Sequence, residues 1–439
     1  MVTRHVFIFV NPTSGSNQAQ NLLNPKVSQI VIMCPTPVHV HFYNSKTNTP
    51  KNHAGFLMLK QVVEDMKNLS KTRTNKECLD EEKKNCIITI AAGGDGTVMH
   101  IINQIFAYNI DSTYVTFGVL PYGTGNDFAK AFGWKNANIS NVFNKNLKRL
   151  RELVFQWINC PVVYHDLWDI IITKHPQGTI QKIDPVSRSK RLVLSKVDTA
   201  TFDHNTTKND ENEENELKLK MSNYFSTGIE SRVGLGFERH RTRLEKLNKS
   251  CYVLESLKKT FFKKKLVINS QVVDLSEIIK RNETTEEYKE IFSQLPDSMV
   301  QLIKSGSIII TNIPSFASGV NVWDNARHWA LTCAPDPDVM KTKQKIGDGI
   351  LEMTTFKGLM SLGLERVLKG QGKRLAQGTG PYRLRFHDTI YSNSIKNCER
   401  IYFQVDGDFF VGTLLKEVRI KLWKKVKVIS QNKALRHKQ

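Results

Sequence analysis

Short apolar runs alternate with helical patterns along the first 160 residues of the chain. His5 to Val10, Cys86 to Ala91 and Val115 to Leu120 are mostly apolar stretches of strand length, as expected of strands buried on both faces. Val38 to Tyr43 instead alternates apolar and polar side chains with a period of two, which also predicts a strand.

Helical patterns separate these strands. One apolar helical face is formed at positions i, i+3, i+4 and i+7 by Leu59, Val62, Val63 and Met66. Two further helices are expected at Val98 to Tyr108 and at Asp127 to Phe132. Strands that alternate with helices imply right-handed crossovers, so residues 1–160 are predicted to form an α/β domain with a parallel sheet.

The pattern changes near Cys160. Val162 to Ile172 is strand-like, and a polar tract that ends in KNDENEENE follows, so we expect residues 174–217 to be a disordered insertion. Short β-rich runs then dominate, among them SIIITNIP, YRLRF, IYFQVDG and VRIKLWKKVKVI. Residues 161–173 and 218–430 are therefore predicted to form a mainly β, sandwich-like domain, followed by a basic tail at 431–439.

Composition narrows the class of protein. The chain has 439 residues, which favours two domains, and a formal charge of +21, which favours polyanionic partners: nucleic acid, anionic lipid or a phosphorylated substrate. We find no nucleic-acid reading module, so no nucleic-acid partner is expected. The seven cysteines lack zinc spacing and are interpreted as reduced thiols. With no signal-peptide pattern and no apolar stretch of roughly 18 residues, we expect a cytoplasmic protein that associates peripherally with membranes.

The motif with the clearest chemistry follows the third strand, where the apolar run ends in Gly93-Gly-Asp-Gly-Thr97. Ligands bind at the carboxyl edge of parallel sheets, and glycines let the backbone approach a ligand closely there. Thr97 can cap the next helix, whose N-terminus favours an anion. Asp95 beside phosphates calls for a cation, so Mg²⁺ is expected there. The alternative is an ordinary strand-to-helix turn.

Two similar loops favour the phosphate interpretation. Asn11-Pro-Thr-Ser-Gly15 and Leu120-Pro-Tyr-Gly-Thr-Gly-Asn-Asp127 also follow predicted strands, so three polar, glycine-containing loops should meet at one edge of one sheet. Neither the P-loop pattern G-x-x-x-x-G-K-[ST] nor a dinucleotide-binding G-x-G-x-x-G is present.

These loops carry a family resemblance. NPTSG, GGDGT and LPYGTGNDFAKAFGW resemble the catalytic domain of diacylglycerol kinases and the related bacterial lipid kinases. The second half is similar to the accessory domain of that family in NYFSTGIESRVGLGFERHR, IIITNIPSFASGVNVW, GDGILEM, GKRLAQG and YFQVDGD. The resemblance covers most of the chain outside the insertions. It implies a fold related to NAD kinases and phosphofructokinases, and an active site in the cleft between an α/β and a β-rich domain.

The resemblance also implies an activity: ATP and diacylglycerol would give ADP and phosphatidate, in lipid metabolism and signalling. Its ATP-binding residues would be Asn11, Ser14, Gly15, Gly93, Gly94, Asp95, Gly96, Thr97, Gly123, Thr124, Gly125, Asn126 and Asp127. In the bacterial relatives the general base is an acid of the D-G-x-L-[DE] stretch, here Asp348 to Glu352. We favour Asp348 as the base, with Asp95 holding Mg²⁺–ATP; Asp95 as base and Asp348 as a plain turn residue are the alternatives.

We expect basic side chains to bring the protein to the membrane that holds its lipid substrate. Arg239 to Lys265 concentrates lysines and arginines around Phe261-Phe262, a composition suited to an anionic membrane, although a solvated basic helix has the same composition. Alternative substrates are ceramide, sphingosine and monoacylglycerol, and a non-catalytic membrane-binding pseudokinase is the alternative from another class. The zinc modules common in animal diacylglycerol kinases are absent from this sequence. Acyl-chain preference and oligomeric state leave no trace in it.

Overall fold

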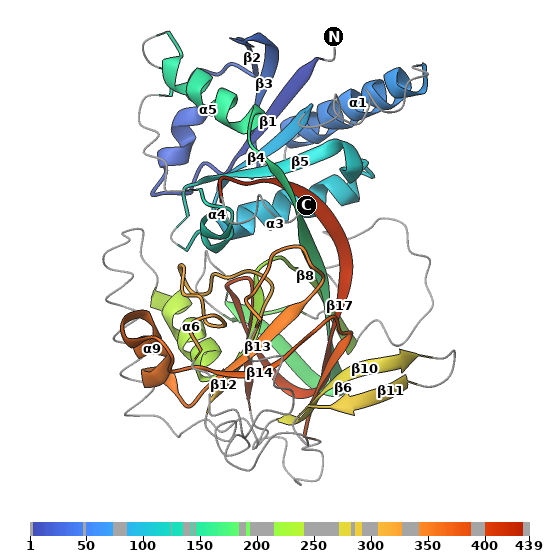
Figure 1. The fold of residues 1–439 in the computed structure, drawn as a ribbon, viewed down its shortest axis with the longest axis vertical. Helices are drawn as coiled ribbons and strands as arrows, with labels where there is room; N and C mark the ends of the chain where they lie inside the picture. The colour runs from blue at the N-terminus through green and yellow to red at the C-terminus, as the bar shows by residue number, and fades with distance from the viewer. Residues whose placement is uncertain are drawn as a thin grey trace. The chain divides into compact units, whose positions relative to one another are not determined.

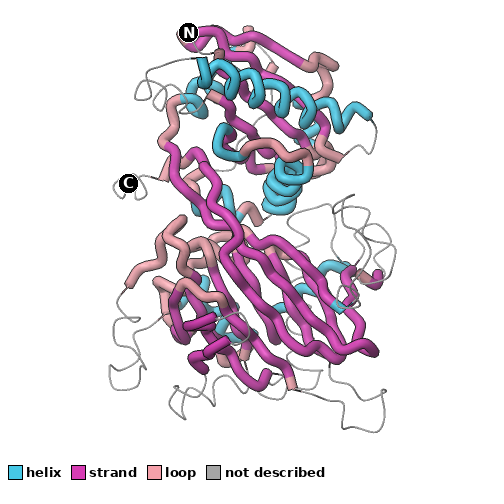
Figure 2. The backbone as a smooth tube through the Cα atoms, turned by 90° about the vertical axis from the view of Figure 1, so that its right-hand side faces the viewer, coloured by secondary structure: helices cyan, strands magenta, loops and turns pink. Residues whose placement is uncertain are grey.

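The computed structural model describes residues 3–46, 50–72, 86–123, 125–134, 142–143, 146–183, 190–193, 215–240, 272–281, 286–291, 306–326, 342–387 and 400–432. The chain forms two compact units: unit 1 comprises Met1–His165 and Lys425–Gln439, and unit 2 comprises Asp166–Lys424. Helices and strands interleave in unit 1, whereas strands dominate unit 2 (Figures 1 and 2).

The sheet of unit 1 is parallel except at one edge. In spatial order its strands are β2 (Gln29–Cys34), β3 (Thr36–Asn44), β1 (Arg4–Val10), β4 (Ile87–Gly93), β5 (Val115–Pro121) and the last part of β17 (Asp408–Ile429). Only β2 runs antiparallel to its neighbour among these pairings. The predicted parallel α/β sheet is therefore confirmed, and the edge strand β2 is an element that the sequence analysis missed.

Helices cover both faces of this sheet. They are α1 (Pro50–Thr72), α3 (Asp95–Ala107), α4 (Asp127–Ala131) and α5 (Lys148–Ile158), with two short 3-10 helices, η1 (Gln18–Leu22) and η2 (Ser112–Tyr114). On one face Phe9 stacks on Phe56 of α1, and on the other the Cys34 thiol donates to the carbonyl of Arg151 in α5. Because water reaches neither face, β1, β4 and β5 read as apolar runs.

Unit 2 is mainly β, as predicted. Its strands are most of β6 (Val162–Ile183), β7 (Lys190–Leu192), β8 (Glu216–Met221), β9 (Tyr224–Gly228), β10 (Val272–Arg281), β11 (Glu286–Glu290), β12 (Ser307–Thr311), β13 (Leu351–Phe356), β14 (Lys373–Gly378), β15 (Tyr382–Phe386), β16 (Ile401–Val405) and most of β17. The antiparallel neighbours run β11-β10-β15-β17-β16-β9-β12-β13-β14, and α6 (Ile229–His240) and α9 (Leu359–Leu368) lie beside them.

Several expected boundaries differ from the structure. Residues 161–165 lie in unit 1 rather than in the β-rich domain, and strands β7 and β8 begin at Lys190 and Glu216, inside the expected insertion. Strand β6 continues through residue 174, where we expected disorder to begin, to Ile183, because Ile180 is fully buried in the core of unit 2 and Thr179 hydrogen bonds to Thr413 of β17. Residues 425–429 lie in unit 1 rather than in the β-rich domain, because Lys427 pairs with Thr116 of β5. The middle of the expected insertion (194–214), the end of the tail (433–439) and the Phe261-Phe262 segment lie outside the described residues.

Candidate active site

Three loops of unit 1 meet where β1, β4 and β5 end. The Asn11 side chain of the first loop donates from Nδ2 to the Thr97 hydroxyl of the second at 3.1 Å. The Tyr122 amide of the third loop donates to the Gly93 carbonyl of the second at 3.0 Å. Hydrogen bonds thus join the three predicted phosphate loops, because parallel strands bring their carboxyl ends to one edge.

The glycines of these loops have two different roles. A Cβ on Gly123 would lie 2.6 Å from the Gly94 Cα, so Gly123 lets the third loop pack against the second, and a Cβ on Gly93 would overlap the Thr97 side chain within the second loop itself. A Cβ on Gly96 would instead meet no described atom within 4 Å, apart from its own chain neighbours and helix turn. The open space over Gly96, at the start of α3, is therefore available to a ligand.

Asp95 ties the second loop to the third. Its carboxylate accepts the amide protons of Asp127 at 3.1 Å and of Phe128 at 2.8 Å, at the start of α4. A carboxylate is the kind of hard oxygen ligand that Mg²⁺ prefers, so the chemistry of the Asp95 side chain fits this ion. Among the described residues no group of three or more His, Cys, Asp or Glu is arranged as a metal site. A Mg²⁺ ion at Asp95 would therefore take its other ligands from water and phosphate oxygens, as this ion commonly does.

Other predicted residues shape the loops. Thr97 was expected to cap the helix, but α3 begins at Asp95 with Gly94 at the cap, so Thr97 lies inside the first turn and accepts the bond from Asn11. Asn126 adopts a left-handed conformation and donates to the Gly123 carbonyl at 2.6 Å. Gly15 also has a positive φ, of 60°. Thr124 lies outside the described residues.

The sequence analysis missed a cation at this edge. Lys46 is an exposed residue that follows the end of β3, and its ammonium group donates to the Thr13 hydroxyl in the first loop. A lysine beside a phosphate-binding loop can pair with a phosphate oxygen. The sequence could have indicated this lysine. Val38 to Tyr43 is predicted to be a strand of the same sheet, so the residues that follow its carboxyl end must lie at this edge.

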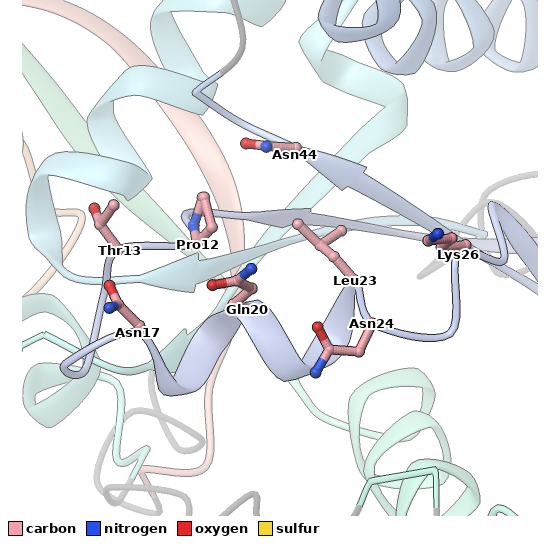
Figure 3. Close-up of a pocket in the computed structure, with 8 residues that line it drawn as sticks. All are labelled: Pro12, Thr13, Asn17, Gln20, Leu23, Asn24, Lys26 and Asn44. Carbon is pink, nitrogen blue, oxygen red and sulfur yellow. The ribbon is translucent and has the colours of Figure 1, made fainter.

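A pocket of about 480 Å³ opens beside the first loop (Figure 3). It is lined by Pro12, Thr13, Asn17, Gln20, Leu23, Asn24, Lys26 and Asn44. In Figure 3 the side chains of Asn17, just before η1, and of Gln20, within η1, lie below Pro12 and Thr13, with Asn44 above them. Six of the eight lining residues have polar side chains, four of them amides, so the pocket offers hydrogen bonds to a ligand next to Thr13.

The second predicted catalytic residue, Asp348, lies in unit 2. Gly347 and Gly349 on either side both have φ of 77°, and one Asp348 oxygen accepts the amide proton of Ile350 at 3.1 Å, so the expected turn is present. Asp166 accepts the amide proton of Gly349 at 2.6 Å. The pKa of Asp348 is raised, first by burial and then by the charge of Asp166, while the bond from Ile350 opposes the shift.

The structure separates the two acids of this motif. Asp348 is half-buried, whereas Glu352 is fully buried on β13 and accepts hydrogen bonds from Gln344 at 2.6 Å and from Gln377 at 2.9 Å. Burial raises the pKa of Glu352 well above its usual range. A substrate could reach only the Asp348 carboxylate of the two.

Asp406 in the VDGD stretch holds the backbone of unit 2. Its carboxylate accepts amide protons from Ser222 at 2.7 Å, Asn223 at 2.8 Å and Tyr224 at 3.0 Å. These three bonds fix the turn between β8 and β9, which gives this aspartate a structural role.

Comparison with known proteins matches both units to one family. Residues 5–154 match the family model of the diacylglycerol kinase catalytic domain, and residues 220–409 match that of the diacylglycerol kinase accessory domain; together they cover more than half of the chain. Human diacylglycerol kinase theta is 24% identical over 67% of this chain and 25% of its own length. Diacylglycerol kinase 1 of Oryza sativa subsp. japonica is 25% identical over 78% of this chain and 64% of its own length. The chain thus spans less than two thirds of these relatives.

Solved structures show weaker likeness. A diacylglycerol kinase from Bacillus anthracis str. Sterne has a TM-score of 0.43 and 12% identity, with 98% of both chains covered. Yeast NADH kinase complexed with NADH has a TM-score of 0.33 and 9% identity, with 98% of this chain and 84% of that chain covered. Similarity this low does not by itself assign a shared fold.

Proposed function

Because this chain belongs to the diacylglycerol kinase family, we propose that it is an ATP-dependent lipid kinase that converts diacylglycerol to phosphatidic acid. The observation that supports this most directly is the meeting of three loops, joined by hydrogen bonds, around the open space over Gly96. Such a site suits phosphates, because the first amides of α3 are not bonded within the helix and its dipole favours anions.

In this proposal the triphosphate lies over Gly96, between the first and third loops. Asn11, Ser14 and Gly15 bound the first side, and Gly123, Gly125 and Asn126 bound the other. Lys46 contributes positive charge beside Thr13. Asp95 holds Mg²⁺, which when bound would neutralise charge on the phosphoryl group being transferred.

Asp348 is proposed to accept the proton of the lipid hydroxyl. The hydroxyl oxygen forms a bond to the γ-phosphorus, the bond from that phosphorus to the β–γ bridging oxygen breaks, and ADP leaves. A base works best when its pKa approaches the working pH, so the raised pKa of Asp348 favours this role. Its carboxyl group must be ionised to act, so kcat/KM should fall with acidification through that raised pKa. The cleft between the two domains stays a prediction.

The family leaves the acceptor open among related lipid alcohols. Diacylglycerol is favoured over ceramide, sphingosine and monoacylglycerol because of the third loop. This loop reads Gly123-Thr-Gly-Asn-Asp127, whereas sphingosine kinases typically have G-S-G-N-[AG] at this place. A role in lipid signalling and a peripheral membrane location follow from this substrate and remain part of the proposal. Within the described ranges, no helix is both long enough and apolar enough to cross a bilayer.

The test is transfer of labelled γ-phosphate from Mg²⁺–ATP to mixed micelles that contain one lipid alcohol at a time. We expect wild-type protein to label diacylglycerol, and Gly94→Asp and Asp348→Asn to abolish labelling while thermal unfolding stays cooperative. Gln344→Leu, which removes a buried partner of Glu352, is the control for damage to unit 2 that spares Asp348. Labelling that survives Asp348→Asn would move the base to Asp95, and labelling of no lipid alcohol would refute the kinase proposal.

A further inference from the structure

Helix α9 turns an apolar stripe to solvent. Met360, Leu364, Val367 and Leu368 are 63%, 40%, 79% and 58% exposed. They occupy positions i, i+4, i+7 and i+8, which share one face of a helix. Soluble helices normally bury such a face, so this stripe needs a partner.

The contacts of the opposite face fix the orientation of α9. Leu359 packs with Ile229 and Val233 of α6, and Figure 1 shows the two helices beside each other. Glu365, the single acid of the helix, is fully buried and accepts the amide protons of Gly370, Gln371 and Gly372 at 3.0, 2.6 and 3.1 Å. The Ser361 hydroxyl accepts the Gly358 amide proton at 3.1 Å and donates to the Gly358 carbonyl at 2.7 Å.

These bonds make the exposed face a fixed feature, because the helix cannot rotate to bury the stripe. A rotation would expose Leu359 and leave the three amides of residues 370–372 without their carboxylate. A buried polar group that loses its partner is costly, typically about 1–3 kcal/mol for each group.

Within the described part of the chain, the charged side chains at the two ends of the stripe are positive. Lys357 precedes the helix and Lys369 follows it, and both side chains are exposed. The acid that would oppose them, Glu365, faces inward. An apolar helical face flanked by lysines matches an anionic bilayer, where the side chains enter the acyl boundary and the ammonium groups meet lipid headgroups.

We propose that α9 is a membrane-docking helix that lies in the interface of an anionic bilayer. The reason for docking rests on the proposed function, because diacylglycerol resides in bilayers. Docking itself requires no catalysis. Asp348 precedes β13 and α9 follows it, and six strand residues span about 20 Å. The helix therefore holds the protein at the membrane and leaves the reacting atoms to other residues.

The first test is flotation of the full chain with vesicles of phosphatidylcholine, with and without phosphatidylserine, and without diacylglycerol. Wild-type protein should bind the anionic vesicles more tightly. The pair Leu364→Gln and Val367→Gln changes no charge and should weaken that binding by about tenfold or more, which is a difference of about 1.4 kcal/mol. Leu57→Gln on α1, where the leucine is 55% exposed, is the matched control and should bind as wild type does.

Activity separates this inference from the proposed function. On a short-chain, water-soluble diacylglycerol the double variant should keep the wild-type kcat/KM, and on vesicles it should lose activity in step with binding. If the wild-type protein is inactive but still binds anionic vesicles about tenfold more tightly than the double variant, the proposed kinase activity is refuted and the docking helix is supported. Unchanged binding by the double variant, or a wild-type dimer that the same changes dissociate in sedimentation, would overturn the docking helix.

Discussion

Replacement of Gly96 by alanine should impair the proposed nucleotide site without disturbing the fold. No described atom lies within 4 Å of the added Cβ, apart from chain neighbours and the helix turn, so the methyl group fits the protein. Gly96 also lies in the first turn of α3, where alanine is a better helix former than glycine. The substitution should therefore leave the protein at least as stable as wild type.

The substitution should have opposite effects on stability, which rises, and on activity, which falls. A glycine-to-alanine change inside a helix stabilises it by roughly 0.5–1 kcal/mol, and the gain at a first-turn position should lie at the lower end. The methyl group also fills the space proposed for the triphosphate and should cost about one charge-assisted hydrogen bond, roughly 1.5–3 kcal/mol. That loss corresponds to a fall of about 10- to 150-fold in kcat/KM for ATP.

The assay pairs urea unfolding with steady-state kinetics at varied Mg²⁺–ATP. Gly123→Ala is the contrasting variant, because its Cβ would lie 2.6 Å from the Gly94 backbone and should lower both stability and activity. A Gly96→Ala protein with wild-type kcat/KM would refute the placement of the nucleotide. A Gly96→Ala protein that unfolds more easily would refute the open space itself.

Three further substitutions test the surroundings of the site. Burial and neighbouring histidines lower the pKa of His5 and His41 to about 4. As the pH falls from about 6.5 towards 4, these histidines bind protons in the unfolded chain before they do so in the folded protein, so unit 1 loses stability. His41→Phe should therefore reduce the loss of unfolding free energy between pH 7 and pH 5 by about 2 kcal/mol in urea titrations, and pH profiles parallel to wild type would contradict this. Asp406→Asn should lower the unfolding free energy by about 2–3 kcal/mol through its three amide bonds while KM for ATP stays constant, and a raised KM would place this side chain at the nucleotide. Asn312→Ala should lower the midpoint of thermal unfolding, because the buried amide accepts from Trp168 and donates to the carbonyls of Asp166 and Ser222; an unchanged midpoint would show that the bonds add nothing net.

Residues 1–160 were largely predictable because their signals are local. A parallel strand covered on both faces must be apolar throughout, so β1, β4 and β5 could be read directly from the sequence. Once those strands were placed, the geometry of parallel sheets put their three glycine loops at one edge. The family resemblance added the roles of the individual residues, which remain predictions at Asp95 and Asp348.

Partners distant in the sequence decided the rest. The Asp95 carboxylate holds the start of α4, and the end of β17 joins the sheet of unit 1 beside β5, about 300 residues away in the sequence. Neither pairing leaves a periodic signal, because each depends on a hydrogen-bonding group that only the folded chain brings near.

Helix α9 shows the same division. This helix was not expected from the sequence, and because LMSLGLERVL has apolar side chains on most sides, its periodicity does not indicate which face is buried. The amides of residues 370–372 decide that question because they donate hydrogen bonds to the buried Glu365 carboxylate, which leaves Met360, Leu364, Val367 and Leu368 on the outside. The sequence supplied the apolar side chains of this segment, and the tertiary structure determined which of them the helix presents on the surface.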